Sequence, residues 1–238
     1  MGTPNRNIVA ELPPPGDDQS PVTWTRAYGY QVEDDLGNTY IDLSAGGMVT
    51  GVGHSHPRVL DAMRSQIDQE LTYTFWWPSK IRDRLERRLE LFHPAEMGKV
   101  ELYNTGTEAT EAAMRLMRLF RDRQTILMIE PAHHGWLEYR WMSPSHDYHM
   151  LPLPAGDSDD EFPRAIDKVQ PESIAGIVYE PIPGYTTRKY PEAYIRQMYE
   201  WAHKHGIPIC ADEVQAGLGR TGRVWSHQHY EVDAPDLL

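Results

Sequence analysis

The sequence has little cysteine and no long apolar run. Cys210 is its one cysteine, so the chain forms no internal disulfide, as is typical of proteins in a reducing compartment. No stretch approaches the ~20 apolar residues that span a bilayer, and residues 1–22 lack the apolar core of a signal peptide. We therefore expect a cytoplasmic protein without a membrane-spanning helix.

Basic residues are also in deficit. The 23 Lys and Arg residues are outnumbered by 35 Asp and Glu residues, which gives a formal net charge of −12. A chain this acidic is a poor candidate for binding nucleic acid or an anionic membrane surface. A small phosphorylated ligand is not excluded, because a local site can bind it.

The second half of the chain alternates between short apolar strands and helices. The pattern predicts strands at 100–103, 126–129, 174–179 and 207–211, and helices at 107–120 and 191–205. Such strands, separated by helices, favour a mostly parallel sheet with helices on both faces. The predicted fold class is therefore α/β.

Before this region we expect an extended arm, a hairpin and two helices. Residues 1–22 are rich in proline, residues 28–43 alternate around a turn, and residues 57–70 and 79–91 have helical spacing. We place a domain boundary after residue 55. Residues 1–55 form the arm and hairpin segment, and residues 56–238 form a large ligand-binding domain.

Polar side chains follow three of the predicted strands. His133 lies just beyond the strand at 126–129, Glu180 follows the strand at 174–179, and Asp212 follows the strand at 207–211. The carboxyl ends of parallel strands meet at one edge of a sheet, where ligands bind. A buried carboxylate is costly unless a cation meets it, so Asp212 is a candidate to face a positively charged ring nitrogen.

A glycine and a threonine begin the helix that follows residue 105. Gly106 allows a close approach of the backbone to a ligand, and Thr107 offers a hydroxyl group. The first amide groups of a helix are unpaired donors, which makes this segment a candidate phosphate site. The alternative is an ordinary helix cap, in which Thr107 satisfies its own helix.

Five motifs occur in a fixed order. They are Gly-His-Ser-His-Pro (53–57), Asn-Thr-Gly-Thr-Glu-Ala (104–109), His-Gly (134–135), Glu-Pro-Ile-Pro-Gly (180–184) and Asp-Glu-Val-Gln-Ala-Gly-Leu-Gly-Arg-Thr-Gly (212–222). With these motifs, the chain from about residue 25 to Leu238 resembles the class III pyridoxal-phosphate (PLP)-dependent aminotransferases, such as 4-aminobutyrate and ornithine aminotransferases. The resemblance implies a fold-type-I PLP-dependent transferase that is incomplete at its C-terminus.

The resemblance also implies roles for six residues in binding PLP. Gly106 and Thr107 would hold the phosphate, and Asp212 would pair with the pyridinium nitrogen. The other three would contact the ring: Val214 beneath it, Gln215 at its phenolic oxygen and His133 on its outer face. At the position of His133 the family usually has Tyr or Phe, which offer more stacking area.

Three further residues are expected near the substrate. Glu180 resembles a glutamate that flanks the substrate pocket of the family. Trp136 stands where members that bind carboxylate-bearing side chains have arginine, which argues against an acetylornithine-type substrate. Trp76 belongs to the aromatic segment 74–78, for which packing at a dimer interface and an apolar wall of the substrate pocket both remain open.

The resemblance implies a Schiff-base lysine at a position beyond Leu238, and no lysine follows Asp212 in this sequence. We therefore expect no catalytic residue within the chain and no turnover by the chain alone. A truncated or split polypeptide, completed by a C-terminal partner, is one explanation, and a homologue without the lysine is the other.

In its complete, homodimeric form the protein is expected to transfer an amino group between an amine or amino acid and an oxo-acid. An aminomutase, racemase or decarboxylase of the same fold remains open, because the PLP-binding motifs do not decide which substrate bond breaks. A non-catalytic module that binds PLP or a partner remains open as well.

Two other motifs resemble a dinucleotide site and a metal site, but we assign neither function to them. The segment 217–222 fits Gly-x-Gly-x-x-Gly, but it neither follows a strand directly nor opens a helix, as a dinucleotide site requires. The His-x-His pairs at 54/56, 203/205 and 227/229 do not place two imidazoles on one helix face, and we expect no metal site.

Overall fold

The computed structural model describes residues 22–71, 76–94, 97–135, 148–152, 154 and 158–238. It divides into two compact units, Met1–Ser79 and Lys80–Leu238, which are described separately. The boundary expected from the sequence, after residue 55, falls inside the first unit.

The first unit contains a three-stranded antiparallel sheet. Its elements are β1 (Trp24–Tyr28), β2 (Gln31–Asp34), β3 (Thr39–Ile41), α1 (Ala45–Met48) and α2 (Pro57–Ile67), and the strand order is β1-β2-β3. The Asp34 carboxylate accepts hydrogen bonds from the backbone amides of Leu36 and Asn38, which fixes the turn between β2 and β3. The predicted hairpin is therefore confirmed, whereas β1 was not predicted.

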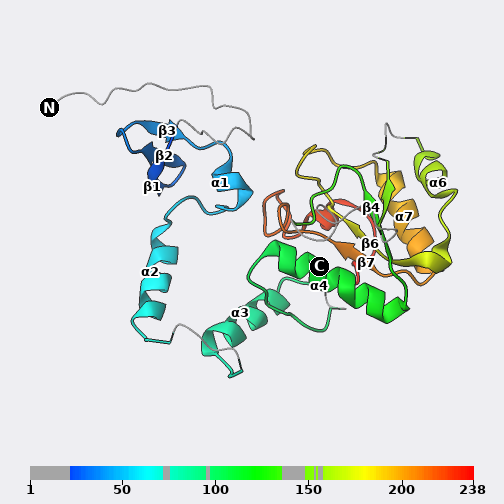
Figure 1. Cartoon of the computed structure of the whole chain (residues 1–238), viewed down its shortest axis with the longest axis horizontal. Helices are drawn as coiled ribbons and strands as arrows, with labels where there is room; N and C mark the ends of the chain where they lie inside the picture. Colours follow the sequence, from blue (N-terminus) through cyan, green and yellow to red (C-terminus); the bar gives the residue numbers. More distant parts are fainter. Residues whose placement is uncertain (1–21, 72–75, 95–96, 136–147, 153, 155–157) are drawn as a thin grey trace. The chain divides into compact units, whose positions relative to one another are not determined.

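The second unit contains a four-stranded parallel sheet in the order β5-β4-β6-β7 (Figure 1). Its elements are α3 (Lys80–Glu90), α4 (Gly106–Arg121), β4 (Thr125–Ile129), β5 (Tyr148–Leu151), α6 (Glu161–Ile166), η1 (Pro171–Ser173), β6 (Ile174–Tyr179), α7 (Glu192–Lys204), β7 (Ile209–Ala211) and η2 (Ser226–His229). The predicted strands at 126–129, 174–179 and 207–211 are confirmed, as are the long helices.

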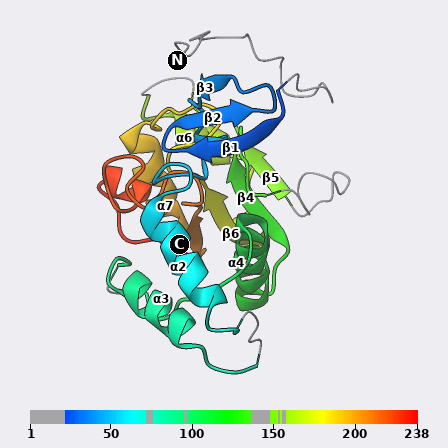
Figure 2. The same ribbon diagram turned by 90° about the vertical axis from the view of Figure 1, so that its left-hand side faces the viewer.

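Helices cover both faces of this sheet, as predicted. Side chains alternate between the faces, so Leu127 and Ile177 join a cluster with Ile195 and Met198 of α7. Met128 and Val178 face the other way, into a second cluster with Met114 and Met117 of α4. Accordingly, α4 and α7 lie on opposite sides of β6 (Figure 2). The two clusters hold the strands of the sheet in place, and they thereby position the edge formed by the carboxyl ends of these strands.

The predicted strand at 100–103 is wrong, because these residues are not in a strand. Val100, Leu102 and their polar neighbours alternate in exposure as a strand would, but a strand also needs a hydrogen-bonded neighbour. The edges of the described parallel sheet are β5 and β7, and neither pairs with this segment.

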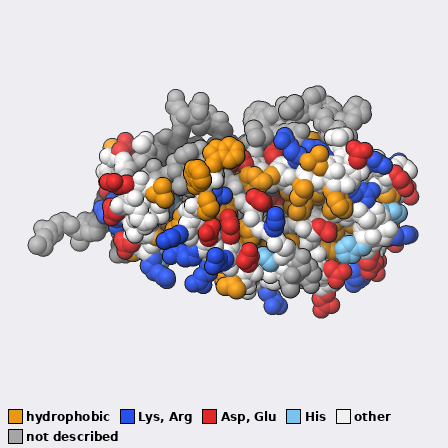
Figure 3. Space-filling view, turned by 90° about the horizontal axis from the view of Figure 1, so that it is seen from below, with side chains coloured by type: hydrophobic (Ala, Val, Ile, Leu, Met, Phe, Trp, Pro, Cys, Tyr) orange, Lys and Arg blue, Asp and Glu red, His pale blue; other side chains and the backbone are white. Residues whose placement is uncertain are grey.

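Acidic and basic side chains alternate along α3, and none of its residues is buried. Seen from below, Lys and Arg side chains lie intermixed with Asp and Glu over the described surface (Figure 3). The mixed charges of α3 and its lack of buried residues agree with a solvated helix face. In the part of the chain that the structure describes, no helix combines the length and the apolar character needed to cross a membrane.

Candidate functional site

Segments that follow three neighbouring strands meet at the carboxyl edge of the second sheet. The backbone amide of Asp212, just after β7, donates to the carbonyl of Tyr179 at the end of β6. The amide of His133, beyond β4, donates to the carboxylate of Glu180, directly after β6. The structure thus brings together the polar residues that were expected to converge.

A buried hydrogen bond joins Asp212 to His134. The distance from Nδ1 of His134 to Oδ2 of Asp212 is 2.7 Å, and the two side chains are 0% and 3% exposed. A carboxylate only accepts hydrogen bonds, so the imidazole donates from Nδ1. Oδ1 of Asp212 also accepts from the amide of Val214, at 3.1 Å. Because each carboxylate oxygen has two lone pairs, Asp212 keeps acceptor capacity for a further donor.

His134 was not among the predicted site residues. The sequence did carry a signal for it, since His-Gly at 134–135 was one of the five motifs. That motif could not identify the partner of His134, because Asp212 lies 78 residues further along the chain.

The first turn of α4 is capped by Thr105. Its Oγ1 accepts from the amide of Glu108 at 3.1 Å, and the Glu108 carboxylate accepts from the amide of Thr105 at 3.0 Å. This reciprocal pair is a capping box. The helix thus has an ordinary cap, as the alternative expected, but Thr105 forms it instead of Thr107. Gly106 and Thr107 occupy the first turn, where the helix dipole favours negative charge.

Close backbone contacts hold the neighbouring loops against this turn. A Cβ atom added to Gly106 would lie 2.8 Å from Cγ1 of Val214, and one added to Gly135 would lie 2.8 Å from Oγ1 of Thr107. The hydroxyl of Thr110 lies 2.6 Å from the carbonyl oxygen of His134, to which it donates. Gly106, Thr107 and Val214, which were predicted to bind one ligand, therefore lie close together.

Glu180 is a buried carboxylate whose two oxygens accept from different loops. Oε2 accepts from the amide of His133 at 3.0 Å, and Oε1 accepts from the amide of Gly184 at 3.2 Å. Burial raises the pKa of Glu180, although these hydrogen bonds oppose the shift. Gly184 in turn lies so close to Gln215 that an added Cβ atom would overlap its amide group. The predicted residue Gln215 therefore lies beside the loop that follows β6.

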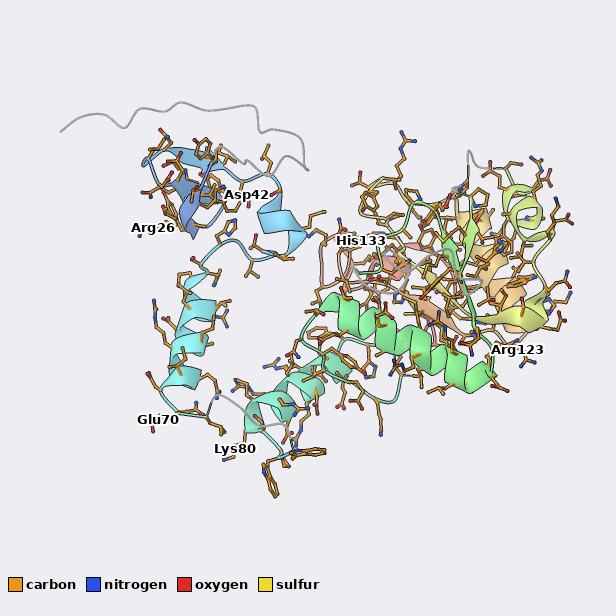
Figure 4. All side chains as sticks on the ribbon, viewed as in Figure 1. Arg26, Asp42, Glu70, Lys80, Arg123 and His133 are labelled. Carbon is orange, nitrogen blue, oxygen red and sulfur yellow. The ribbon has the colours of Figure 1, made fainter. Side chains whose placement is uncertain are left out.

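The imidazole of His133 contacts the ring of Tyr185. The ring centroids are 6.0 Å apart and the planes are at 86°, an edge-to-face arrangement. Figure 4 shows His133 near the end of α4 that begins at Gly106, whereas Arg123 lies beyond the other end. Tyr185 was not predicted, and nothing in its sequence context identified it.

Glu213 fixes the segment that carries Asp212. Its carboxylate accepts from the amides of Ser226 and His227, both at 2.8 Å, and from both of their side chains. Burial acts to raise the pKa of Glu213, but these hydrogen bonds outweigh burial and lower it. Glu213 was also missed as a site residue, although it belongs to the Asp-Glu-Val-Gln motif.

The structure does not place two of the predicted substrate residues, Trp136 and Trp76, at this site. Trp136 falls outside the described residues. Trp76 belongs to the first unit and is 84% exposed there. Their assignment to a substrate pocket stays a prediction.

The comparison with known proteins extends over nearly the whole chain. The aminotransferase class-III family matches residues 13–238. An acetylornithine aminotransferase from Methanopyrus kandleri is 32% identical over 230 residues, which are 92% of this chain and 57% of that protein. An isoleucine 2-epimerase from Lentilactobacillus buchneri is 28% identical over 243 residues, which are 89% of this chain and 54% of that protein.

A solved structure shares the fold. The taurine:2-oxoglutarate aminotransferase from Bifidobacterium kashiwanohense, in complex with PLP and glutamate, matches with a TM-score of 0.83 and 24% identity. The match covers 90% of this chain and 55% of that one. The fold is therefore that of the fold-type-I PLP-dependent transferases, and the chain spans little more than half the length of the relatives it matches. On its family match and its identity to these relatives, the chain belongs to the class III aminotransferases.

Proposed function

We propose that this chain is the PLP-binding portion of an aminotransferase, which in its complete form moves an amino group between an amine or amino acid and an oxo-acid. The observation that carries the proposal is the buried Asp212–His134 pair, placed at the same sheet edge as the start of α4. A flat ring with a protonated nitrogen and a phosphate group matches this combination of an acceptor and a helix N-terminus.

The described residues fit PLP in chemical type. The Asp212 carboxylate has acceptor capacity for the ring N–H, and its charge favours the protonated ring. Hydrogen bonds from His134 and Val214 hold this carboxylate in place. The amides of Gly106 and Thr107 would hold the phosphate. When bound, PLP supplies an electron sink for the substrate carbon.

Three side chains would contact the ring itself. Val214 is aliphatic and lies against Gly106, so it would pack beneath the ring. His133 would cover the outer face, and Gln215 would reach the phenolic oxygen. Glu180, Trp76 and Trp136 are proposed to lie near the substrate.

We further propose that the Schiff-base lysine comes from polypeptide beyond Leu238, either continuous with this chain or separate from it. The 238-residue chain should then bind PLP without becoming covalently attached to it. A second copy of the chain would form the homodimer, and the small-molecule partners are an amine or amino acid and an oxo-acid. The single cysteine, buried in β7, suits a reducing compartment such as the cytoplasm.

PLP titration of the chain and its Asp212 variants tests the proposal. Asp212→Ala should weaken binding at least about tenfold, because a charge-assisted hydrogen bond to the ring is lost. Asp212→Asn keeps the volume and an acceptor for Val214, so it should remain folded and bind weakly. Asp233→Ala, at an exposed carboxylate, is the matched control. Unchanged affinity in folded Asp212 variants would overturn the proposal.

Borohydride reduction in the presence of PLP tests the proposed origin of the lysine. The chain alone should show no stoichiometric label, whereas the chain combined with the missing C-terminal segment should be labelled at one lysine. Stoichiometric labelling of the chain alone at one buried site, accompanied by turnover, contradicts this part of the proposal.

A racemase or epimerase is the second candidate function, because one relative is named an isoleucine 2-epimerase. The two activities differ in the fate of the amino group. A transaminase releases an oxo-acid, whereas an epimerase exchanges the α-hydrogen and retains the amino group. Assaying the complete protein for oxo-acid and for solvent deuterium at the α-carbon separates them. A decarboxylase would release carbon dioxide, and an aminomutase would yield a positional isomer.

A non-catalytic module is tested by the coding DNA that follows the codon of Leu238. A lysine codon in frame, or in an adjacent second reading frame, supports the enzyme. A stop codon with no complementary frame supports a module that binds PLP or a full-length partner.

A further inference from the structure

One buried carboxylate holds two loops that come from different strands. Oε2 of Glu180 accepts from the amide of His133, and Oε1 accepts from the amide of Gly184. The residue is 5% exposed, so these bonds are shielded from water. Glu180 therefore fixes the spacing between the loop after β4 and the loop after β6.

The side chains beside those amides meet each other. His133 and Tyr185, which follows Gly184, contact edge to face, with centroids 6.0 Å apart. This distance and angle are favourable for an aromatic pair. Tyr185 is 58% exposed, so much of its surface faces solvent beside a constrained backbone.

A second contact fixes the loop after β6. Gly184 lies against the side-chain amide of Gln215, with no space for a Cβ atom between them. Gln215 belongs to the segment that carries Asp212, which is linked to β6 through the carbonyl of Tyr179. Tyr185 thus extends from a turn that is anchored to the β4, β6 and β7 exits together.

We propose that Tyr185 and His133 form the surface that receives the substituent of the amino substrate, and that Glu180 acts as its positioning residue. The surface selects an uncharged aromatic or apolar substituent over one that ends in a carboxylate. This inference rests on the proposed function, because it assumes that PLP lies between Val214 and His133.

The charges near this pair support the selection. The Glu180 carboxylate holds the loops that carry both rings, and it would repel a further carboxylate brought close to it. An aromatic substituent gains edge or face contacts with Tyr185 and His133 at no such cost. Lys189, on the same loop, is engaged with Glu192 at 2.6 Å. Arg188 is the exposed cation closest to Tyr185 in sequence, so it provides a control.

Stable conjugates allow the test without the missing lysine. Reduced phosphopyridoxyl conjugates of phenylalanine and of glutamate share the cofactor half and the α-carboxylate, and they differ only in the side chain. Their affinities for the 238-residue chain, with PLP as a third ligand, are measured by fluorescence titration. We expect the phenylalanine conjugate to bind about tenfold more tightly than the glutamate conjugate.

Variants assign this preference to the aromatic pair. Tyr185→Ala should abolish most of the preference and leave the affinity for PLP unchanged, whereas Tyr185→Phe should retain both. Glu180→Gln presents an NH₂ group to one of the two backbone amides, so it should reduce the preference as Tyr185→Ala does. Arg188→Ala should change neither quantity.

The outcomes separate this inference from the proposed function. PLP binding with no preference between conjugates, or with a preference for glutamate, overturns the inference alone. A uniform loss of affinity for all three ligands in Tyr185→Ala indicates a structural role and also overturns it. Failure of the unaltered chain to bind PLP overturns both the inference and the proposed function.

Discussion

Gly135 sits where only a glycine satisfies both the backbone and its neighbour. Its φ of +107° is rarely adopted by other residues, and a Cβ atom there would lie 2.8 Å from Oγ1 of Thr107. Gly135→Ala should therefore lower the free energy of unfolding by about 2 kcal/mol. Because the clash displaces the first turn of α4, PLP affinity should fall as well. Urea denaturation and PLP titration measure the two effects.

Gly219 provides the matched control for that substitution. Its φ is +92°, but an added Cβ atom would meet nothing within 4 Å. Gly219→Ala thus carries the backbone cost, about 1 kcal/mol, without the clash, and should leave PLP affinity unchanged. Equal effects of both alanines on stability and affinity would show that Thr107 and Gly135 are not tightly packed.

Individual residues of the site were predictable to different degrees. Asp212 and Val214 follow an apolar strand, so their place at the carboxyl edge of the sheet was predictable, whereas Gly106 was expected there through a strand at 100–103 that does not form. The bonds of Glu180 and Glu213 could not be foreseen, because they depend on which backbone amides the loops present. The role of Tyr185 could not be predicted for the same reason, because its contact with His133 depends on the hydrogen bonds by which Glu180 holds both loops.

At the scale of the elements, the capping box determines how well the start of α4 is ordered. The side chains of Thr105 and Glu108 each accept a hydrogen bond from the backbone amide of the other residue. Thr105→Ala removes one of these bonds and should lower stability by about 1 kcal/mol. Hydrogen exchange should become faster at residues 106–109, and PLP affinity should fall because the phosphate contacts fray. Thr105→Ser keeps the acceptor and should behave as the unaltered chain. If neither variant changes PLP affinity, the phosphate does not bind at this turn.

The turn between β3 and α1 depends on one carboxylate in the first unit. Asp42 accepts from the amides of Ser44 and Gly46 and contacts Nε2 of His54 at 2.6 Å. Burial acts to raise the pKa of Asp42, but these hydrogen bonds prevail and lower it from 3.8 to about 2. A carboxyl group with a depressed native pKa stabilises the fold above its unfolded pKa. That stabilisation is lost as the pH falls from about 4 through about 2.

An NMR titration of the Gly46 amide from pH 6 to pH 1.5 checks this dependence. The resonance should report opening of the turn toward the lower end of that range. Asp42→Asn removes the titrating group, so its turn should be weaker at neutral pH and insensitive over the same interval. Opening of the turn as the pH rises would contradict the assigned sign.

Elements with strong periodicity were predicted well, and edge elements were not. The buried strands β4 and β6 are continuous apolar runs, and α4 and α7 have clear apolar stripes. In contrast, β5 lies at a sheet edge and buries only Leu151, so its sequence has no distinctive pattern. The segment 100–103 has strand-like alternation but no hydrogen-bonded partner strand among the described residues, and propensity alone could not reveal that.

At the scale of the whole chain, apolar burial is very unevenly distributed. Val32 is the buried hydrophobic residue of the first unit, among the residues that the structure describes. The second unit buries two clusters on the two faces of its parallel sheet. Because burial of apolar surface is the main stabilising contribution, the two units should differ strongly in stability.

Hydrogen exchange should therefore separate the units. Amides of β4 and β6 should exchange only through unfolding of the second unit, whereas amides of β1–β3 should exchange through easier local opening. Met128→Ala removes a fully buried side chain of β4 and should cost about 3 kcal/mol. Exchange in β4 and β6 should then accelerate about 100-fold, while β1–β3 stay unchanged. Equal acceleration in both sheets would mean that the first unit owes its stability to the core of the second, and that the chain unfolds as one cooperative body.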